Sequence, residues 1–260
     1  MELSDHLLNE YYRQGFMYIP NVFNSREISA LKKETNRIFE LPLDTHLIGE
    51  GGEVLGTTAM DRVSSLYTRL LTDERLLGFA TTILGGSLYC HQYKVIVKKP
   101  FGKNTLPWHQ DFGPWYHHDG MPEPRALSIG IYLDKVTNFN GPITCMSHSH
   151  SSGLLEYQVE KVPGTTPIPS LSAETMTKLA ESGELVAPIG DAGSILVFDC
   201  CTAHASGPNM SPFPRDLVYI SYNRTDNAIT KPSRPDHFAN QNFDSLKVTK
   251  SCEGDLVDSL

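Results

Sequence analysis

The sequence changes character near residue 87, and this change limits the folds that the chain can adopt. Before it, apolar residues recur at helical spacing; after it, short runs rich in β-forming residues alternate with turn residues. Several short strands at such spacing are typical of a β-sandwich or jelly roll. We therefore expect a mainly β core preceded by helices. The β-rich runs cover 87–98, 105–111, 125–134, 142–146, 184–187, 194–199 and 216–223.

The first part of the chain contains residues typical of helix ends. Ser4 and either Asn24 or Ser25 are of the types that cap helix N-termini, and Gly15 is of the type that ends a helix. The expected elements are helices at 4–14, about 26–39 and about 63–84 with a break near Thr72–Asp73, a strand at 16–19, and irregular, glycine-rich chain at 41–62.

The length of the chain suits one domain, which we expect to cover residues 1–260. A helical part over about 1–85 leads into a double-stranded β-helix core, a jelly roll of the cupin kind, over about 87–224. The polar residues 225–260 are expected to form a flexible tail that wraps on the surface.

Two segments are long enough or flexible enough to cover a site. The interval 147–183 has the length of an insertion or lid, and a helix is expected within it at 172–182. The glycine-rich stretch 49–56 is the other candidate. The sequence does not decide between them.

The charge balance disfavours several classes of partner. The net charge is −8 and the pI is about 5.7, whereas nucleic acids and anionic membranes bind basic surfaces. The sequence contains no apolar run of transmembrane length, and its first residues lack the basic and then apolar pattern of a signal peptide. We expect a cytoplasmic protein without a nucleic-acid or membrane partner, whose oligomeric state the sequence leaves open.

The five cysteines are expected to be reduced, mostly buried thiols, because their spacing fits neither a zinc site nor an even disulfide framework. Cys200 and Cys201 lie close to His204 in the sequence, and this raises the question of metal ligation. Adjacent residues of a strand face opposite ways, so we do not expect both to bind one ion.

A candidate metal site is formed by His109, Asp111 and His204. Two histidines and one carboxylate form the facial triad that holds non-haem Fe(II) and leaves positions open for substrate and oxygen. Residues i and i+2 of a strand point to the same face, so His109 and Asp111 could bind one ion together. Arg215 follows His204 by 11 positions, and its guanidinium could hold a carboxylate with two parallel hydrogen bonds.

Several motifs together resemble the phytanoyl-CoA dioxygenase superfamily of Fe(II)/2-oxoglutarate oxygenases. Within it, the chain is nearest to the branch of ectoine hydroxylase and bacterial L-proline trans-4-hydroxylase. The resemblance spans roughly residues 10–230. Its motifs are His91–Lys94, Trp108–Asp111 with Trp115 and Asp119–Met121, Asn140–Pro142, Gly193–Ile195, His204–Arg215 and Tyr222–Ala228.

The resemblance implies roles for individual residues. His109, Asp111 and His204 would be the iron ligands, and Arg215 would bind the distal carboxylate of 2-oxoglutarate. Ser206 could add a hydroxyl at that end, and Gln92 would contact the co-substrate. Lys94 either helps to bind a carboxylate or stays solvated.

Other polar and aromatic residues have two interpretations each. Trp115 and Tyr116 would form a wall for the substrate or else a hydrophobic plug. Arg125 could meet a substrate carboxylate or pair with a surface acid. Asn223 and Asp226 could line the pocket or only make turns. The roles of four further histidines stay open: His117, His118, His148 and His150.

The implied activity is hydroxylation of a free amino acid or amino-acid-like molecule, with proline as the first candidate. Fe(II), 2-oxoglutarate and O2 would take part, ascorbate would stimulate, and succinate would be released. A larger natural-product, peptidyl or acyl-CoA substrate is the alternative within the class. Asp111 argues against a halogenase, in which a small residue replaces this ligand. A non-catalytic binding module on the same barrel is the alternative from another class.

Overall fold

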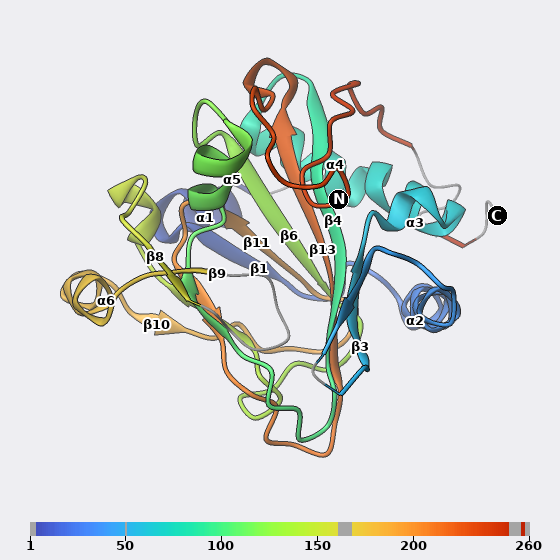
Figure 1. Cartoon of the computed structure of the whole chain (residues 1–260). Coiled ribbons are helices and arrows are strands. Elements are labelled where there is room, and N and C mark those ends of the chain that lie inside the picture. Colours follow the sequence, from blue (N-terminus) through green and yellow to red (C-terminus); the bar gives the residue numbers. More distant parts are fainter. Residues whose placement is uncertain (1–3, 50, 161–167, 250–255, 258–260) are drawn as a thin grey trace.

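Two antiparallel sheets form the body of the protein (Figure 1). The structure is a computed structural model, and it describes residues 4–49, 51–160, 168–249 and 256–257. The larger sheet contains, in spatial order, β1 (Phe16–Ile19), β11 (Ile195–Asp199), β6 (Ala126–Tyr132), β13 (Arg215–Arg224), β4 (Leu88–Lys98), β3 (Val54–Thr58) and β2 (His46–Ile48). The smaller sheet contains β10 (Leu185–Val186), β7 (Ile143–Met146), β12 (His204–Ser206) and β5 (Leu106–His109).

The two faces of the larger sheet have different neighbours. On β13, Val218 and Ile220 point into the main apolar core, which the sheet shares with helices. Leu217, one position earlier, packs instead with Ile143 of the smaller sheet. This alternation is the period of two expected of a strand covered on both faces. The expected mainly β, double-stranded β-helix architecture with flanking helices is confirmed.

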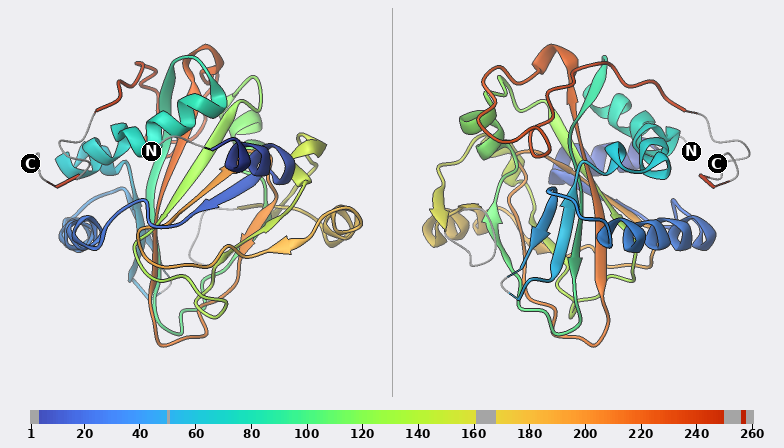
Figure 2. Two further views of the ribbon diagram at one scale, coloured as in Figure 1. Left: turned by 180° about the vertical axis from the view of Figure 1, so that it is seen from behind. Right: turned by 45° about the vertical axis from the view of Figure 1, so that its right-hand side comes forward.

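Helices cover the outer face of the larger sheet, as Figure 2 shows from behind. Ser4 caps α1 and Gly15 ends it with a positive φ of 86°, as expected. Asn24 caps α2 and exchanges hydrogen bonds with Glu27 in a capping box, so it rather than Ser25 begins the helix. The four N-terminal helices are α1 (Asp5–Gln14), α2 (Ser25–Phe39), α3 (Ser65–Thr72) and α4 (Glu74–Leu84).

Two stretches differ from the expected secondary structure. Residues 41–62 are not irregular: β2 and β3 pair antiparallel there, and a short 3-10 helix, η1 (Met60–Arg62), follows. The aromatic stretch after Asp111, which lies between two of the expected strands and for which no helix was predicted, is the helix α5 (Phe112–Asp119). β3 also pairs with β4, and this pairing stabilises the β2–β3 hairpin. The glycine-rich sequence of the hairpin alone does not indicate this stability.

The interval after β7 contains the short helix η2 (Ser149–Ser152), the ribbon of β8 (Gln158–Glu160) and β9 (Ile168–Ser170), and the expected helix as α6 (Ala173–Ala180). Residues 161–167 lie outside the described part. The tail begins with η3 (Thr225–Asn227). It buries Ile229, Ala239 and Leu256, so its described part is more firmly packed than the expected flexible tail.

None of the helices in the described ranges has the length and apolar character that crossing a bilayer requires. The four cysteines that the structure describes are free and buried, as expected, whereas Cys252 lies outside the described residues.

Candidate metal centre

His109 and His204 are brought together by strand pairing. His109 is the last residue of β5, His204 is the first of β12, and the two are direct partners in the antiparallel register. Their ring centroids lie 4.2 Å apart. His204 therefore begins a strand of its own, rather than only following β11 as the sequence suggested.

Asp111 completes the group from outside the sheet. β5 ends at His109, and Asp111 occupies the N-cap position of α5, so the expected same-face geometry within one strand is wrong. The turn into α5 nevertheless places Asp111 Oδ1 3.9 Å from His109 Nε2 and 4.0 Å from His204 Nε2. The other carboxylate oxygen, Oδ2, accepts a hydrogen bond of 2.8 Å from Ser128 of β6. Ser128 thus leaves Oδ1 directed at the histidines.

Backbone carbonyls fix which nitrogen of each histidine is free. His109 Nδ1 lies 2.8 Å from the Pro107 carbonyl oxygen, and His204 Nδ1 lies 2.9 Å from that of Thr202. A carbonyl only accepts, so each Nδ1 carries the proton and each Nε2 presents its lone pair. Two Nε2 atoms and one carboxylate oxygen therefore converge, all within 4.8 Å of one another. This donor set fits a divalent metal such as Fe(II).

The electrostatics of the group favour neutral histidines beside an ionised carboxylate. Burial and the neighbouring His204 lower the pKa of His109 to about 3. Burial likewise lowers the pKa of His204. Burial raises the pKa of Asp111, but His204, Lys94 and His109 outweigh it, and the carboxyl pKa lies below its ordinary value. These are the protonation states that a metal ion requires of its ligands.

A second polar site lies at the start of β13. Arg215 is fully buried, and its Nε and Nη2 donate to the Gly141 carbonyl oxygen at 3.0 and 2.8 Å. Its Nη1 has no hydrogen-bond partner among the described residues. Leaving a buried donor without an acceptor is costly, so this nitrogen is suited to an incoming anion.

Lys98 is a functional candidate that the sequence interpretation missed. It pairs directly with Arg215 across the β13–β4 ladder and is also buried. Its ammonium donates to the carbonyl oxygens of Asn104 at 3.0 Å, Ser206 at 3.3 Å and Gly207. Burial and the charge of Arg215 lower its pKa to about 6. A charged Lys98 beside Arg215 in the protein interior is therefore unfavourable unless an anion joins them.

The signal for Lys98 was present in the sequence. Val95, Ile96 and Val97 precede it in a strand that reads as buried, and a lysine at the end of such a run must find acceptors. The packing around Lys98 also requires glycine at position 141. A Cβ on Gly141 would lie 2.7 Å from the Gly207 carbonyl oxygen and 2.8 Å from Lys98 Cδ.

Gln92, Lys94 and Ser206 lie near these two groups. Gln92 pairs with Ser221, whose hydroxyl lies 2.9 Å from that of Ser128. The Lys94 ammonium lies 5.5 Å from the centre of the Tyr219 ring, and burial lowers its pKa although Asp111 opposes this. The nearby Asp111 is therefore one of the few groups that favour a charged Lys94. Ser206 is buried, and its carbonyl oxygen accepts from Lys98.

Gln92 is engaged by the tail. Its amide donates 2.7 Å to the Phe238 carbonyl oxygen. The tail therefore reaches the same strand that carries the expected site residues, a contact that the sequence did not indicate.

The expected aromatic wall is divided between the interior and the surface. Trp115 is buried in a cluster with Phe112, Met121 and Ile229, which corresponds to the hydrophobic plug. Tyr116 is 45 % exposed and packs edge-on against His117.

Three other expected substrate residues have partners of their own. Arg125 lies 2.9 Å from Glu123 and 3.7 Å from Asp226, and all three side chains are largely exposed. Asn223 is buried, and its amide donates to Tyr89 Oη and the Asn227 carbonyl oxygen. The structure therefore pairs Arg125 and Asp226 on the surface and places Asn223 in a turn network.

The remaining histidines lie apart from the triad. His117 and His118 are exposed on α5, and His148 has a positive φ of 63° before η2. His150 Nε2 lies 3.1 Å from the Tyr12 carbonyl oxygen.

A second cluster of possible ligands consists of Asp199, Cys200 and Cys201, also within 4.8 Å of one another. The expectation that the two cysteines face opposite ways is wrong, because they lie in a turn after β11 rather than in a strand. Burial raises the pKa of the Cys200 thiol, which opposes formation of a metal-binding thiolate.

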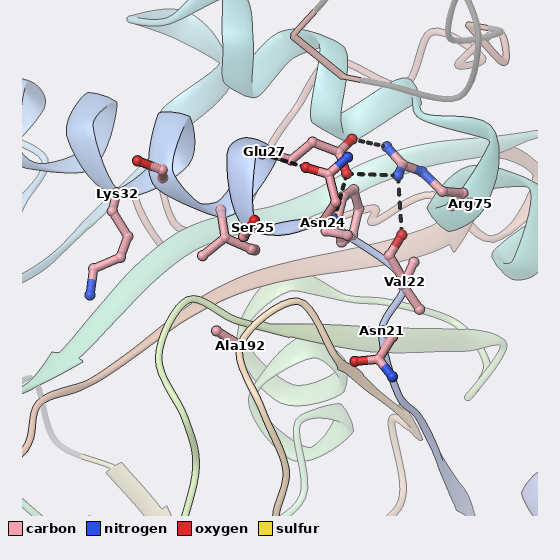
Figure 3. A pocket seen from close by; sticks show the side chains of 11 residues that line it. Asn21, Val22, Asn24, Ser25, Glu27, Lys32, Arg75 and Ala192 are labelled. Carbon is pink, nitrogen blue, oxygen red and sulfur yellow. Dashed lines mark hydrogen bonds and ion pairs between the residues drawn. The ribbon is translucent and has the colours of Figure 1, made fainter.

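A surface hollow lies apart from the triad. It measures about 880 Å³ and lies at the N-terminus of α2, lined by Asn21, Asn24, Lys32 and Arg75 among others (Figure 3). Its charged groups already have partners: Arg75 contacts Glu27 at 2.7 Å and Asp73 at 2.8 Å, and Lys32 contacts Asp134. The converging ligands, rather than this hollow, are the better guide to function.

Comparison with known proteins gives consistent results. The model of the family described as phytanoyl-CoA dioxygenase (PhyH) matches residues 11–217. The ectoine dioxygenase of Halomonas elongata is 34% identical over 241 residues, which cover 88% of this chain and 73% of that protein. The ectoine dioxygenase of Stutzerimonas stutzeri is 32% identical over 244 residues, covering 88% and 80%.

Solved structures show the same fold. The crystal structure of EctD from S. alaskensis with 2-oxoglutarate and 5-hydroxyectoine has a TM-score of 0.86 at 29% identity, and covers 98% of this chain and 89% of that one. A second structure of that protein contains bound Fe, with a TM-score of 0.85 and the same coverage. The carbocyclase SnoK from nogalamycin biosynthesis, at 19% identity and a TM-score of 0.71, covers 90% and 89% and shares the fold.

Proposed function

The chain belongs to the phytanoyl-CoA dioxygenase (PhyH) family of oxygenases, and we propose that it is an Fe(II)- and 2-oxoglutarate-dependent hydroxylase of a small cyclic amino-acid derivative, with ectoine as the first candidate. The observation that carries the proposal is the convergence of His109 Nε2, His204 Nε2 and Asp111 Oδ1. The proposal treats residues 1–260 as one catalytic domain.

His109, Asp111 and His204 would hold the iron. When bound, Fe(II) would couple O2 to the decarboxylation of 2-oxoglutarate and so supply the oxidising power for C–H hydroxylation. The protein contributes two neutral imidazoles and one carboxylate at fixed positions. Ser128 orients the carboxylate, and the carbonyl oxygens of Pro107 and Thr202 hold the two rings.

The Arg215 end of the barrel would bind the distal carboxylate of 2-oxoglutarate. Arg215 Nη1 has no hydrogen-bond partner among the described residues, and the Gly141 carbonyl oxygen fixes the other side of the guanidinium. A carboxylate bound here would favour the protonated form of Lys98, which would then add positive charge to this end. Ser206, whose carbonyl oxygen accepts from Lys98, would add its hydroxyl to the same pocket. An anion would relieve the opposition of the two cations.

The substrate would bind between the metal centre and the segments that cover it. Gln92 and Lys94 lie on the strand that pairs with Tyr219 and Ser221, away from the Arg215 end. We therefore assign their amide and ammonium groups to the substrate, in place of the co-substrate contact that the resemblance implied for Gln92. A zwitterionic amino-acid derivative presents a carboxylate that Lys94 could meet. Water exclusion follows from the burial of His109, His204 and Gln92.

Ectoine is placed ahead of proline on the strength of the relatives. The similar proteins of known activity are named ectoine dioxygenases, and EctD was solved with 5-hydroxyectoine. Proline, the first candidate of the sequence analysis, becomes the second candidate. The stretch 222–228 does not favour it, since Asn223 and Asp226 serve local contacts there.

Succinate release tests the proposal. The purified protein, supplied with Fe(II), ascorbate and 2-oxoglutarate, should form succinate in the presence of ectoine and add one oxygen atom to it, as mass analysis would show. A panel with L-proline and other cyclic amino acids ranks the substrates by kcat/KM. Turnover of proline alone would reverse the order of the two candidates. No binding of iron or 2-oxoglutarate would contradict the enzymatic proposal and favour a binding module.

A further inference from the structure

A buried ion pair joins the end of α5 to the tail. Asp119, the last residue of α5, has a fully buried side chain. Arg234 Nε donates to its Oδ1 at 2.9 Å, and Arg234 Nη2 donates to its Oδ2. Both oxygens of the carboxylate therefore meet one guanidinium, the strongest geometry available to such a pair.

The tail around Arg234 forms a connection between two parts of the site. We call residues 229–240 the strap. On one side, the backbone amides of Lys231 and Ser233 donate to the carbonyl oxygens of Asp119 at 3.0 Å and His118 at 2.8 Å. On the other side, the strap meets β4, the strand that carries Gln92.

Three hydrogen bonds connect the strap to β4. Asn240 donates two of them, from its backbone and its side chain, and the Gln92 side chain donates the third. The Asn240 amide nitrogen donates 3.1 Å to the His91 carbonyl oxygen, and its side chain donates 2.8 Å to that of Cys90. The Phe238 carbonyl oxygen accepts from Gln92. The strap therefore determines how Gln92 points.

The strap also covers Trp115. Ile229 and Ala239 of the strap belong to the same buried cluster as Trp115, which is 1% exposed. His91 packs edge-on against the indole, with 4.9 Å between the ring centroids. Displacement of the strap would uncover the indole, so Trp115 can report on the position of the strap.

The Asp119–Arg234 pair lies beside a buried histidine without a hydrogen bond. Neither ring nitrogen of His91 has a partner among the described residues, and its Nε2 lies 3.5 Å from Asp119 Oδ2. Arg234 is thus the cation that compensates the Asp119 carboxylate. Removal of one partner of such a pair leaves a buried charge, which is strongly unfavourable.

We propose that Asp119 and Arg234 form a latch that holds the strap closed over the substrate side of the metal centre, and that they act as positioning residues for Gln92 and α5. Asp111 is the N-cap residue of α5 and Asp119 is its last residue, so the latch fixes the end of the helix that is far from the proposed iron ligand. The inference rests on the proposed function, because it assigns the substrate side to Gln92.

The decisive measurement combines fluorescence with kinetics. In a Trp108→Phe background, Trp115 is the remaining tryptophan of the chain. Arg234→Gln should raise acrylamide quenching of Trp115 about three-fold or more, since the indole would become accessible. The KM for the amino-acid substrate should rise about ten-fold. The KM for 2-oxoglutarate should stay within about two-fold of the parent value. Arg215 is the first residue of β13, whereas Gln92 pairs with Ser221 toward the end of that strand.

Matched variants separate the latch from general damage. Lys178→Gln breaks the exposed pair of Lys178 with Glu174 on α6, outside the strap, and should leave quenching and both KM values as in the parent. Arg234→Lys keeps the charge but loses the fork, so it should give intermediate values. If Arg234→Gln does not fold, Asn240→Ala loosens the β4 end of the strap and should raise quenching in the same way.

The outcomes are distinguishable. Quenching and substrate KM that stay unchanged in both Arg234→Gln and Asn240→Ala would overturn the latch. Increased quenching in a protein that turns over none of the tested substrates would support the latch and count against the proposed function. A parallel rise in the KM for 2-oxoglutarate would overturn the positioning role and indicate a general loss of structure.

Discussion

His204 and His109 are direct partners in the ladder between β12 and β5, with 4.2 Å between their ring centroids. This pairing unites residues 95 positions apart in the chain. Both rings are then oriented by the carbonyl oxygen of the residue two positions earlier, Pro107 or Thr202. The nitrogen ligands thus depend on backbone hydrogen bonds, whereas the carboxylate ligand depends on the turn into α5.

Replacing Asp111 should remove metal binding. In Asp111→Ala the two imidazoles remain, but the charged ligand is lost, so iron affinity and substrate-dependent succinate formation should fall at least about 100-fold. Titration of the apoprotein with Fe(II) under anaerobic conditions measures the first effect. Ser128→Ala removes the hydrogen bonds to Asp111 Oδ2 and to Ser221 but keeps all three ligands, so it should have a smaller effect. Full activity of Asp111→Ala would refute the ligand assignment.

Arg215→Lys should weaken the use of 2-oxoglutarate. A lysine cannot contact Gly141 and also offer a second planar donor, so the KM for 2-oxoglutarate should rise about ten-fold or more. The kinetics are measured at saturating amino-acid substrate. Arg125→Lys, a change at an exposed ion pair, is the control and should leave this KM unchanged. An unaltered KM in Arg215→Lys would exclude the carboxylate role.

Lys98 should make the stability of the protein depend on pH. Its folded pKa of about 6 lies below the ordinary lysine value, so between these values the unfolded chain binds more protons than the folded protein. The free energy of unfolding should therefore rise with pH, by up to about 1.4 kcal/mol per pH unit from this residue.

Lys98→Met should flatten that part of the pH profile. Urea unfolding of both proteins at several pH values between about 6.5 and 8.5 gives the difference in slope. Lys99→Met, at an exposed neighbouring position, should preserve the slope of the parent. Parallel profiles for the parent and Lys98→Met would show that Lys98 keeps its ordinary pKa in the folded protein.

The hollow at the N-terminus of α2 should matter for stability rather than for catalysis. Glu27 is fully buried and accepts from Arg75, from the Asn24 amide at 2.8 Å and from the Leu256 amide at 2.8 Å. Glu27→Ala should cost about 3 kcal/mol of unfolding free energy. Kinetic constants measured well below the unfolding temperature should stay unchanged.

A surface pair on the same helix provides the control. Glu34→Ala breaks the pair of Glu34 with Arg37 and should cost no more than about 0.5 kcal/mol. Chemical unfolding measures both variants. A loss of activity in folded Glu27→Ala would assign the hollow a catalytic role after all.

The elements that the sequence predicted well are those with local signals. Ser4, Asn24 and Gly15 mark helix ends by their own chemistry, and the alternation along β13 reflects a strand with two covered faces. The hairpin of β2 and β3 was missed because Gly49 and Gly56 weaken a strand pattern. Its stability comes from pairing with β4, which no local pattern encodes.

The candidate site was predicted in composition but not in geometry. The three proposed ligands and Arg215 were identified from residue type and order, yet Asp111 reaches its place through a turn rather than a strand. α5 was missed because its apolar residues show little helical periodicity. Lys98 was missed because its role depends on Arg215, 117 positions later in the chain. The hydrogen bond from Gln92 to the Phe238 carbonyl oxygen in the tail was missed for the same reason, because it joins segments that are distant in the sequence.

The backbone carbonyls behind His109 and His204 have a consequence for metal supply. Because they set the two Nε2 lone pairs in place, the donor set is ready for any divalent first-row ion of suitable size. Such nitrogen and oxygen ligands bind Co(II), Ni(II) and Cu(II) more strongly than Fe(II). The ion that occupies the protein is therefore decided by the free metal concentrations of its surroundings, and the metal content of a purified sample records how it was grown and handled.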